Sequence, residues 1–155
     1  MRGFVVSVLI GLSATLLSAA QTSPEQATIE QTGSTNTLGV RMTVTPGGTA
    51  HVQQQGLTTR ETNVQSQLSQ RLFEDLKTVG PLSDLPKTHC VKSVSFGTSL
   101  YLKYNGQTSP DLSCPAPPDS KVAILKKDVR DLMQAAHATP PIGHRIIAAP
   151  AVLPH

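Results

Sequence analysis

The residues best suited to chemistry are the two cysteines, Cys90 and Cys114, which bracket a stretch rich in hydroxyl side chains. What they do depends on the compartment that holds the chain. In an oxidising compartment two cysteines most often pair, whereas in a reducing one they remain free thiols. A disulfide is therefore predicted if the protein is exported, and two buried free thiols are the alternative.

Export is predicted from the first 20 residues. A basic start, Met1-Arg2, precedes an apolar stretch at 4–17, and Ser18 and Ala20 provide the small residues of a cleavage site. We therefore expect residues 1–20 to be a signal peptide and the mature protein to begin near Gln21, in the periplasm or outside the cell. The alternative is an uncleaved membrane anchor, but a membrane-spanning helix needs about 20 apolar residues and the stretch at 4–17 is shorter.

A disulfide matters because the core has few large side chains. The mature aromatic residues are Phe73, Phe96, Tyr101 and Tyr104, and the chain has no tryptophan. Small domains with little to bury are commonly stabilised by cross-links. A bond between the cysteines closes a loop of about 25 residues, which the loop-entropy model values at roughly 3.5 kcal/mol.

Other catalytic and metal-binding patterns are missing from the sequence, so we expect a protein without enzymatic activity, metal or cofactor. The five histidines have no ligand spacing, and the serines include no G-x-S-x-G elbow. A set such as Ser95, His51 and Asp111 would have to be assembled by the fold, because triads are defined by geometry. A small hydrolase with an unrecognised site therefore stays open.

Charge does not favour nucleic acid as a partner, and no stable membrane span is expected after cleavage. The whole chain has 13 Lys and Arg against 10 Asp and Glu. Removal of the signal peptide would also remove Arg2, so the mature chain is close to neutral. The densest basic cluster, at 126–130, alternates with Asp128 and Asp131. This alternation is typical of a solvated helix face.

Hydrophobic periodicity predicts the order strand, strand, helix, strand, strand, helix. Residues 40–44 and 50–52 alternate in polarity around a Pro-Gly-Gly turn, and residues 94–96 and 100–104 indicate a second hairpin. Leu68, Leu72, Phe73 and Leu76 form one helical stripe, with Asn63 or Ser66 as its N-cap.

A final helix is expected after Asp119 or Ser120, although residues 120–125 would also fit a short strand. The predicted fold is α+β: two hairpins form a four-stranded antiparallel sheet that packs on two helices (ββαββα) with one disulfide. The domain would span 32–137, between a flexible leader at 21–31 and a proline-rich disordered tail at 138–155.

A partner surface is predicted on the polar face of the sheet and the loop that follows it. Its members are Tyr101, Lys103, Asn105, Ser109 and Asp111. An exposed aromatic side chain on a polar sheet can anchor a partner. The alternative is that Tyr101 packs against a loop or the tail.

The stretches TGSTNT, GGTAHV, CVKSVSFGTS and GQTSPDLSCP resemble a group of small secreted bacterial proteins to which no function is assigned. The likeness spans Thr32 to about Met133 and implies no activity. The expected element order is also similar to that of emfourin-type protease inhibitors, although their glycine-rich opening is not matched here. Layout alone does not transfer function.

These observations favour an exported binding module whose partner is another exported protein, with inhibition of a protease or other hydrolase as one form. The alternative is a component of the cell envelope that binds a surface glycan, because the predicted surface is rich in Ser, Thr, Asn and Gln.

Overall fold

The computed structural model describes residues 24–87 and 89–139. The predicted signal peptide at 1–20, residues 21–23 of the predicted leader and positions 140–155 of the predicted tail lie outside them. In chain order the elements are β1 (Ala27–Gln31), β2 (Val40–Val44), β3 (Thr49–Gln54), β4 (Arg60–Asn63), α1 (Ser66–Val79), the 3₁₀ helix η1 (Leu82–Asp84), β5 (Leu100–Tyr104), β6 (Gln107–Thr108) and α2 (Lys121–Ala135).

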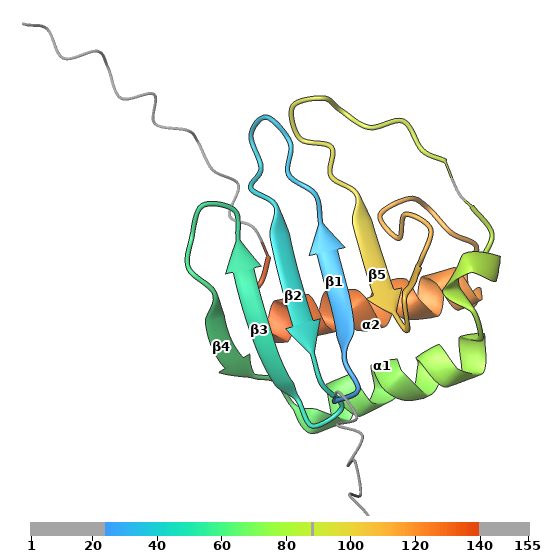
Figure 1. The fold of residues 1–155 in the computed structure, drawn as a ribbon. Helices are drawn as coiled ribbons and strands as arrows, with labels where there is room; N and C mark the ends of the chain where they lie inside the picture. The colour runs from blue at the N-terminus through green and yellow to red at the C-terminus, as the bar shows by residue number, and fades with distance from the viewer. Residues whose placement is uncertain (1–23, 88, 140–155) are drawn as a thin grey trace, which may run out of the picture.

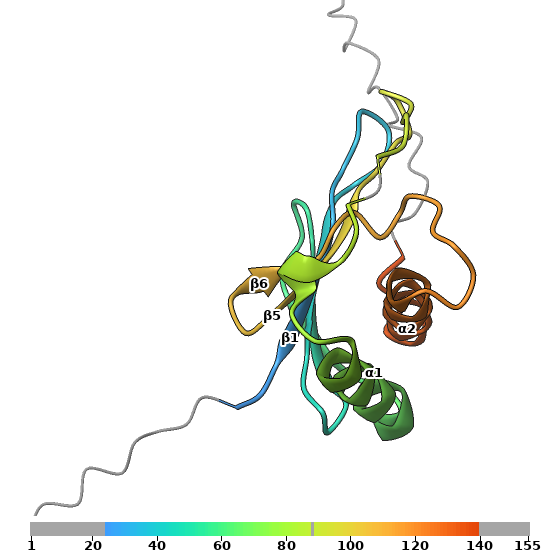
Figure 2. The ribbon, with the colours of Figure 1, turned by 90° about the vertical axis from the view of Figure 1, so that its right-hand side faces the viewer.

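The α+β class is confirmed, but the predicted four-stranded sheet is wrong. Six antiparallel strands lie in the order β4-β3-β2-β1-β5-β6, so the predicted ββαββα order is not matched. Both helices cover the same face of this sheet, and the opposite face carries no helix of the described chain (Figures 1 and 2).

The first predicted hairpin is confirmed as β2 and β3. Val44 lies opposite Ala50, and the apolar residues of both strands point toward the helices. Gly48 adopts a φ of 93°, which favours glycine. A Cβ there would lie 2.5 Å from the carbonyl oxygen of Val64, so both backbone conformation and close approach require glycine in this turn.

The predicted flexible leader is wrong for residues 27–31, because they form β1 in the middle of the sheet. This strand pairs with β2 on one side and with β5 on the other. Ala27, Ile29 and Gln31 are on the side of the strand that faces the helices, and Ala27 and Ile29 are fully buried. Two apolar side chains among polar neighbours were too short a pattern to identify a strand from sequence.

The second predicted hairpin is also wrong. Residues 94–96 form a turn, and β5 pairs instead with β1 and, through Asn105-Gly106, with β6. Asn105 and Gly106 have φ values of 48° and 73°, as a two-residue hairpin turn requires. The polar stretch at 60–63, for which the sequence predicted no strand, is the edge strand β4, since the side chains of an edge strand need not be buried.

Both predicted helices are confirmed, and residues 120–125 enter α2 rather than a strand. The Ser120 hydroxyl accepts a hydrogen bond from the N–H of Ala123, so the predicted cap of α2 is confirmed. The cap predicted for α1 is wrong, because its N-cap is Gln65 and makes no side-chain bond. The core lies between helices and sheet; its largest buried side chains include Ile29, Met42, Leu72, Leu102, Leu125 and Leu132.

An ionic contact joins the two helices. Arg71 of α1 donates to Asp128 and Asp131 of α2, each over 2.6 Å. Asp128 is 2% exposed, and burial, reinforced by the Asp75 carboxylate, raises its pKa to about 6 although Arg71 acts in the opposite direction. Of the charged residues at 126–131, Asp128 and Asp131 therefore make the contact with α1.

The folded part of the described chain includes Ala138, beyond the predicted boundary at 137. Ala138, assigned to the tail from sequence, is fully buried, and its N–H donates to the carbonyl oxygen of Met133. Arg60 of β4 donates to the carbonyl oxygens of Ala136 and His137, over 2.6 and 2.9 Å. The C-terminal end of α2 is thus tied to the edge of the sheet.

Candidate functional site

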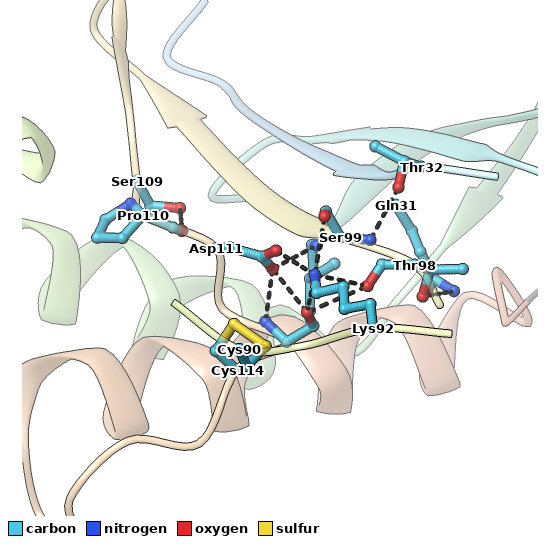
Figure 3. Close-up of polar contacts among 12 residues, drawn as sticks. Gln31, Thr32, Cys90, Lys92, Thr98, Ser99, Ser109, Pro110, Asp111 and Cys114 are labelled. Atoms are coloured by element: carbon cyan, nitrogen blue, oxygen red, sulfur yellow. Dashed lines mark hydrogen bonds and ion pairs between the residues drawn. A yellow bond between two sulfur atoms is a disulfide. The ribbon is translucent and has the colours of Figure 1, made fainter. Parts of the chain in front are cut away.

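The predicted disulfide between Cys90 and Cys114 is present in the structure, with a Cα–Cα distance of 5.5 Å. It joins the segment after η1 to the segment after β6, as Figure 3 shows. Both segments lack regular secondary structure, so the cross-link holds together two stretches that have few backbone hydrogen bonds to secure them.

Next to the disulfide, the ammonium group of Lys92 is enclosed by oxygen atoms (Figure 3). It forms an ion pair with Asp111 and donates to the Thr98 carbonyl, the Ser99 hydroxyl and the Ser113 hydroxyl over 2.9, 2.8 and 2.7 Å. One side chain therefore fixes the chain before the turn at 94–96, the chain after it, and the return segment at 111–113.

Asp111 completes this arrangement. Burial by itself would raise the pKa of the Asp111 carboxyl, but hydrogen bonds from Lys92, from the N–H of Leu100 and from Ser113 hold it well below its ordinary range. The carboxylate consequently remains charged at any physiological pH. We call Lys92, Asp111 and their hydrogen-bond partners the lysine clamp.

A second set of contacts braces the turn from the other side. The Ser34 hydroxyl and the Asn36 N–H both donate to the Ser95 carbonyl, over 2.9 and 3.0 Å. Thr32 and Ser99 exchange two bonds of 2.8 Å, one to a backbone carbonyl and one to a hydroxyl. The β1–β2 loop and the segment before β5 therefore run side by side (Figure 1).

The braced segment presents apolar side chains to solvent. Val91 is fully exposed, and Val94 and Phe96 are 87% and 59% exposed. We call residues 91–97 the apolar loop. The contacts described above fix the backbone of this loop, unlike that of an ordinary surface loop. Exposed apolar side chains that lie close together are typical of interaction sites.

A pocket of about 580 Å³ opens beside the disulfide. We call it the disulfide pocket. Its apolar lining comes from Leu82, Leu85, Pro110 and the cystine, and its polar lining includes Lys87, His89, Tyr101 and the lysine clamp. It lies between the segment that follows η1 and the β5–β6 end of the sheet.

The structure brings together three of the five residues predicted to form a partner surface. Tyr101, Ser109 and Asp111 all line the disulfide pocket. Ser109 is buried, and its hydroxyl accepts from the N–H of Leu102, so it supports the wall rather than offering a free contact. The exposed apolar loop was missed, because residues 94–96 were interpreted as a buried strand.

The other two predicted residues lie elsewhere. Lys103 is on the open face of the sheet, where it pairs over 2.6 Å with Glu30, which also contacts Arg41. These cations lower the pKa of Glu30 despite its partial burial. Asn105 occupies the β5–β6 turn. A hollow of about 380 Å³ lies at the end of β1, β2 and β3 where Gln31, Val40 and Gln54 are paired, and its lining includes Gln31, Gln53, Gln54 and Gln55.

Two arrangements that could support catalysis are not formed by these groups. A lysine that activates a serine must offer a lone pair, whereas Lys92 donates hydrogen bonds and faces a carboxylate. Ser95, His51 and Asp111 are not assembled, because β1 and β2 separate His51 on β3 from the β5 side of the sheet. Within 24–87 and 89–139, no three His, Cys, Asp or Glu residues are placed to bind a metal ion.

No protein-family model matches the chain, and no curated protein matches it in sequence. Among the residues that the structure covers, no helix has the length and apolar character needed to cross a membrane.

Proposed function

We propose that this protein is an exported, non-enzymatic binding module that engages another exported protein through the apolar loop. The observation that carries the proposal is the exposure of Val94 and Phe96 on a segment whose backbone is fixed by a disulfide, a lysine clamp and the β1–β2 loop. Rigid loops lose little conformational entropy on binding, so contacts made by their side chains contribute more fully to affinity.

Export is supported by the disulfide, because such bonds persist in oxidising compartments. A periplasmic or extracellular location also agrees with the basic and apolar pattern of residues 1–20. A disulfide stabilises a small domain against unfolding in such compartments, and a binding protein needs a stable scaffold to present its binding surface.

Inhibition of an exported protease or other hydrolase is one form that this binding can take. The N–H of Gly97 donates to the Ser93 carbonyl over 2.7 Å, so the apolar loop is a compact turn and not an extended strand. It would therefore block a cleft as a wedge, without imitating the extended backbone of a substrate.

The proposal is tested with a photo-reactive amino acid placed at position 96 in the cells that export the protein. A matched control exists, because Leu57 in the β3–β4 turn is also 59% exposed. We expect a protein adduct of defined mass from position 96 and none from position 57. Equal labelling at the two positions, or none at position 96, would remove the apolar loop as the binding surface.

A second candidate, binding of a surface glycan, is favoured by the glutamine-lined hollow at the end of β1, β2 and β3. Amide groups of Gln53 and Gln55 and the guanidinium of Arg41 can hydrogen-bond to sugar hydroxyls. Co-sedimentation with isolated cell wall, compared between the native protein and the Gln53→Ala, Gln55→Ala double variant, tests this function. Identical recovery of the two proteins would exclude this hollow as the glycan site.

A further inference from the structure

The disulfide pocket has the size and mixed lining of a site for a small ligand. Its volume of about 580 Å³ falls within the range of known ligand pockets, roughly 300 to 1,000 Å³. Leu82, Leu85 and Pro110 form an apolar wall with the cystine, so the pocket can hold an apolar group out of water. Hydroxyl groups of Ser83, Tyr101 and Thr108 add polar contacts.

The charges around the pocket favour an anionic ligand. The carboxylate of Asp111 is the pocket's acidic group, and Lys92 already neutralises it within the clamp. Lys87 also lines the pocket, is exposed, and makes no ion pair with any residue of 24–87 or 89–139. One uncompensated ammonium group beside an apolar wall matches one carboxylate attached to an apolar body.

We propose that the disulfide pocket binds an apolar monocarboxylate, with its carboxylate at Lys87 and its apolar part against Leu85 and Pro110. Two sources share this chemistry: a medium-chain fatty acid, and the C-terminus of a peptide that ends in an apolar residue. A multiply charged phosphate compound fits less well, because Lys87 provides one positive charge and the Lys92 ammonium is already paired with Asp111.

The pocket is prepared for a ligand by the same contacts that fix the apolar loop. Cys90 and Lys92 both line it, and each is held by the cross-link or the clamp. Little reorganisation is therefore needed on binding. The inference does not depend on a protein partner for the apolar loop, since the exposed side chains of Val91, Val94 and Phe96 do not line the pocket.

The probes are octanoate and N-acetyl-leucyl-leucine, each compared with its uncharged carboxamide. Amide chemical shifts of the mature exported protein are followed by NMR during titration. We expect saturable shifts around Leu85, Tyr101 and Asp111 with a carboxylate, and affinity at least about tenfold lower for its carboxamide. Binding of octanoate alone identifies a fatty acid site, binding of the peptide alone identifies a peptide site, and both support the shared chemistry.

Two variants test the assigned contacts. Lys87→Gln is expected to weaken carboxylate binding about fivefold or more without changing carboxamide binding, and Lys77→Gln on α1 is the control for loss of a surface charge. Ser83→Trp, at an exposed position, should fill the pocket and abolish binding of every probe. An unchanged NMR spectrum outside the pocket shows that each variant is folded.

Three results would overturn the inference: no saturable shift up to about 1 mM probe, equal affinity for acid and amide, or equal effects of the Lys87 and Lys77 changes. Phe96→Asp, which disrupts the apolar loop, should leave octanoate and peptide binding unchanged. Failure of the pocket and failure of the proposed protein-binding function are therefore distinguished by separate variants.

Discussion

Replacing both cysteines, Cys90→Ser with Cys114→Ser, should destabilise the whole domain and not just the loop beside it. The native bond joins residues 24 positions apart, so it closes a loop of about 25 residues in the unfolded chain. The loop-entropy relation gives roughly 3.5 kcal/mol for a loop of this length. Stability totals of small domains are about 5–15 kcal/mol, so the loss is a large fraction.

The expected fall in melting temperature is about 10 to 20 °C, taking a few degrees per kcal/mol for a domain of this size. Circular dichroism during heating and chemical unfolding of the double variant and the native protein provide the measurement. Val91→Ala is the control, since that side chain is fully exposed and its loss should change stability by less than about 0.5 kcal/mol.

Hydrogen exchange separates two explanations of the result. If the bond acts mainly on the unfolded chain, exchange should accelerate for core amides such as those of Ile29 and Leu102 as well as for the apolar loop. A loss below about 1 kcal/mol, with faster exchange confined to 90–99, would refute the reasoning. It would mean that the lysine clamp and the strands already provide the stability assigned to the disulfide.

Three other changes test the remaining features. Asp128→Asn should raise the free energy of unfolding by on the order of 2 kcal/mol at pH 8 and much less at pH 4. The pKa of Asp128 is raised to about 6, so the native carboxyl stabilises the fold below pH 4. This contribution is lost as the pH rises through 6, whereas the asparagine side chain does not titrate. An equal gain at both pH values in denaturant unfolding would contradict this. Lys92→Met leaves the Asp111 carboxylate buried without its cation and should cost about 3 kcal/mol in the same assay, whereas a loss under about 1 kcal/mol would show that the clamp is dispensable. Ile29→Ala should cost about 3 kcal/mol, and a thermal melt unchanged from native would contradict the placement of β1 in the core.

The elements that were predicted correctly are those with several apolar residues in one period. The β2–β3 hairpin has Val40, Met42 and Val44 on one face, and α1 and α2 each have a continuous helical stripe. In such segments the local hydrophobic pattern agrees with the burial in the folded protein, so the sequence is sufficient to predict the element.

The strands that were missed are short or polar. β1 contributes two fully buried residues, Ala27 and Ile29, and β4 contributes an exposed edge. Each forms because a neighbouring strand offers a row of hydrogen-bonding groups: β5, which is distant in sequence, pairs with β1, and β3 pairs with β4. The apolar residues at 91–96 show the opposite error, since their β-forming composition did not bring them into the sheet.

The sequence alone determined the helices and one hairpin, because each depends on local periodicity, and it predicted the pairing of the two cysteines from export and from there being just two thiols. Tertiary structure alone decided that Asp111 meets Lys92, that Tyr101 faces a pocket, and that Val94 and Phe96 face solvent. Those relations join segments that local periodicity does not connect and that the fold brings together, with β1 paired between β2 and β5. No local pattern encodes the insertion of a strand at the centre of a sheet, since its stability comes from partners on both sides.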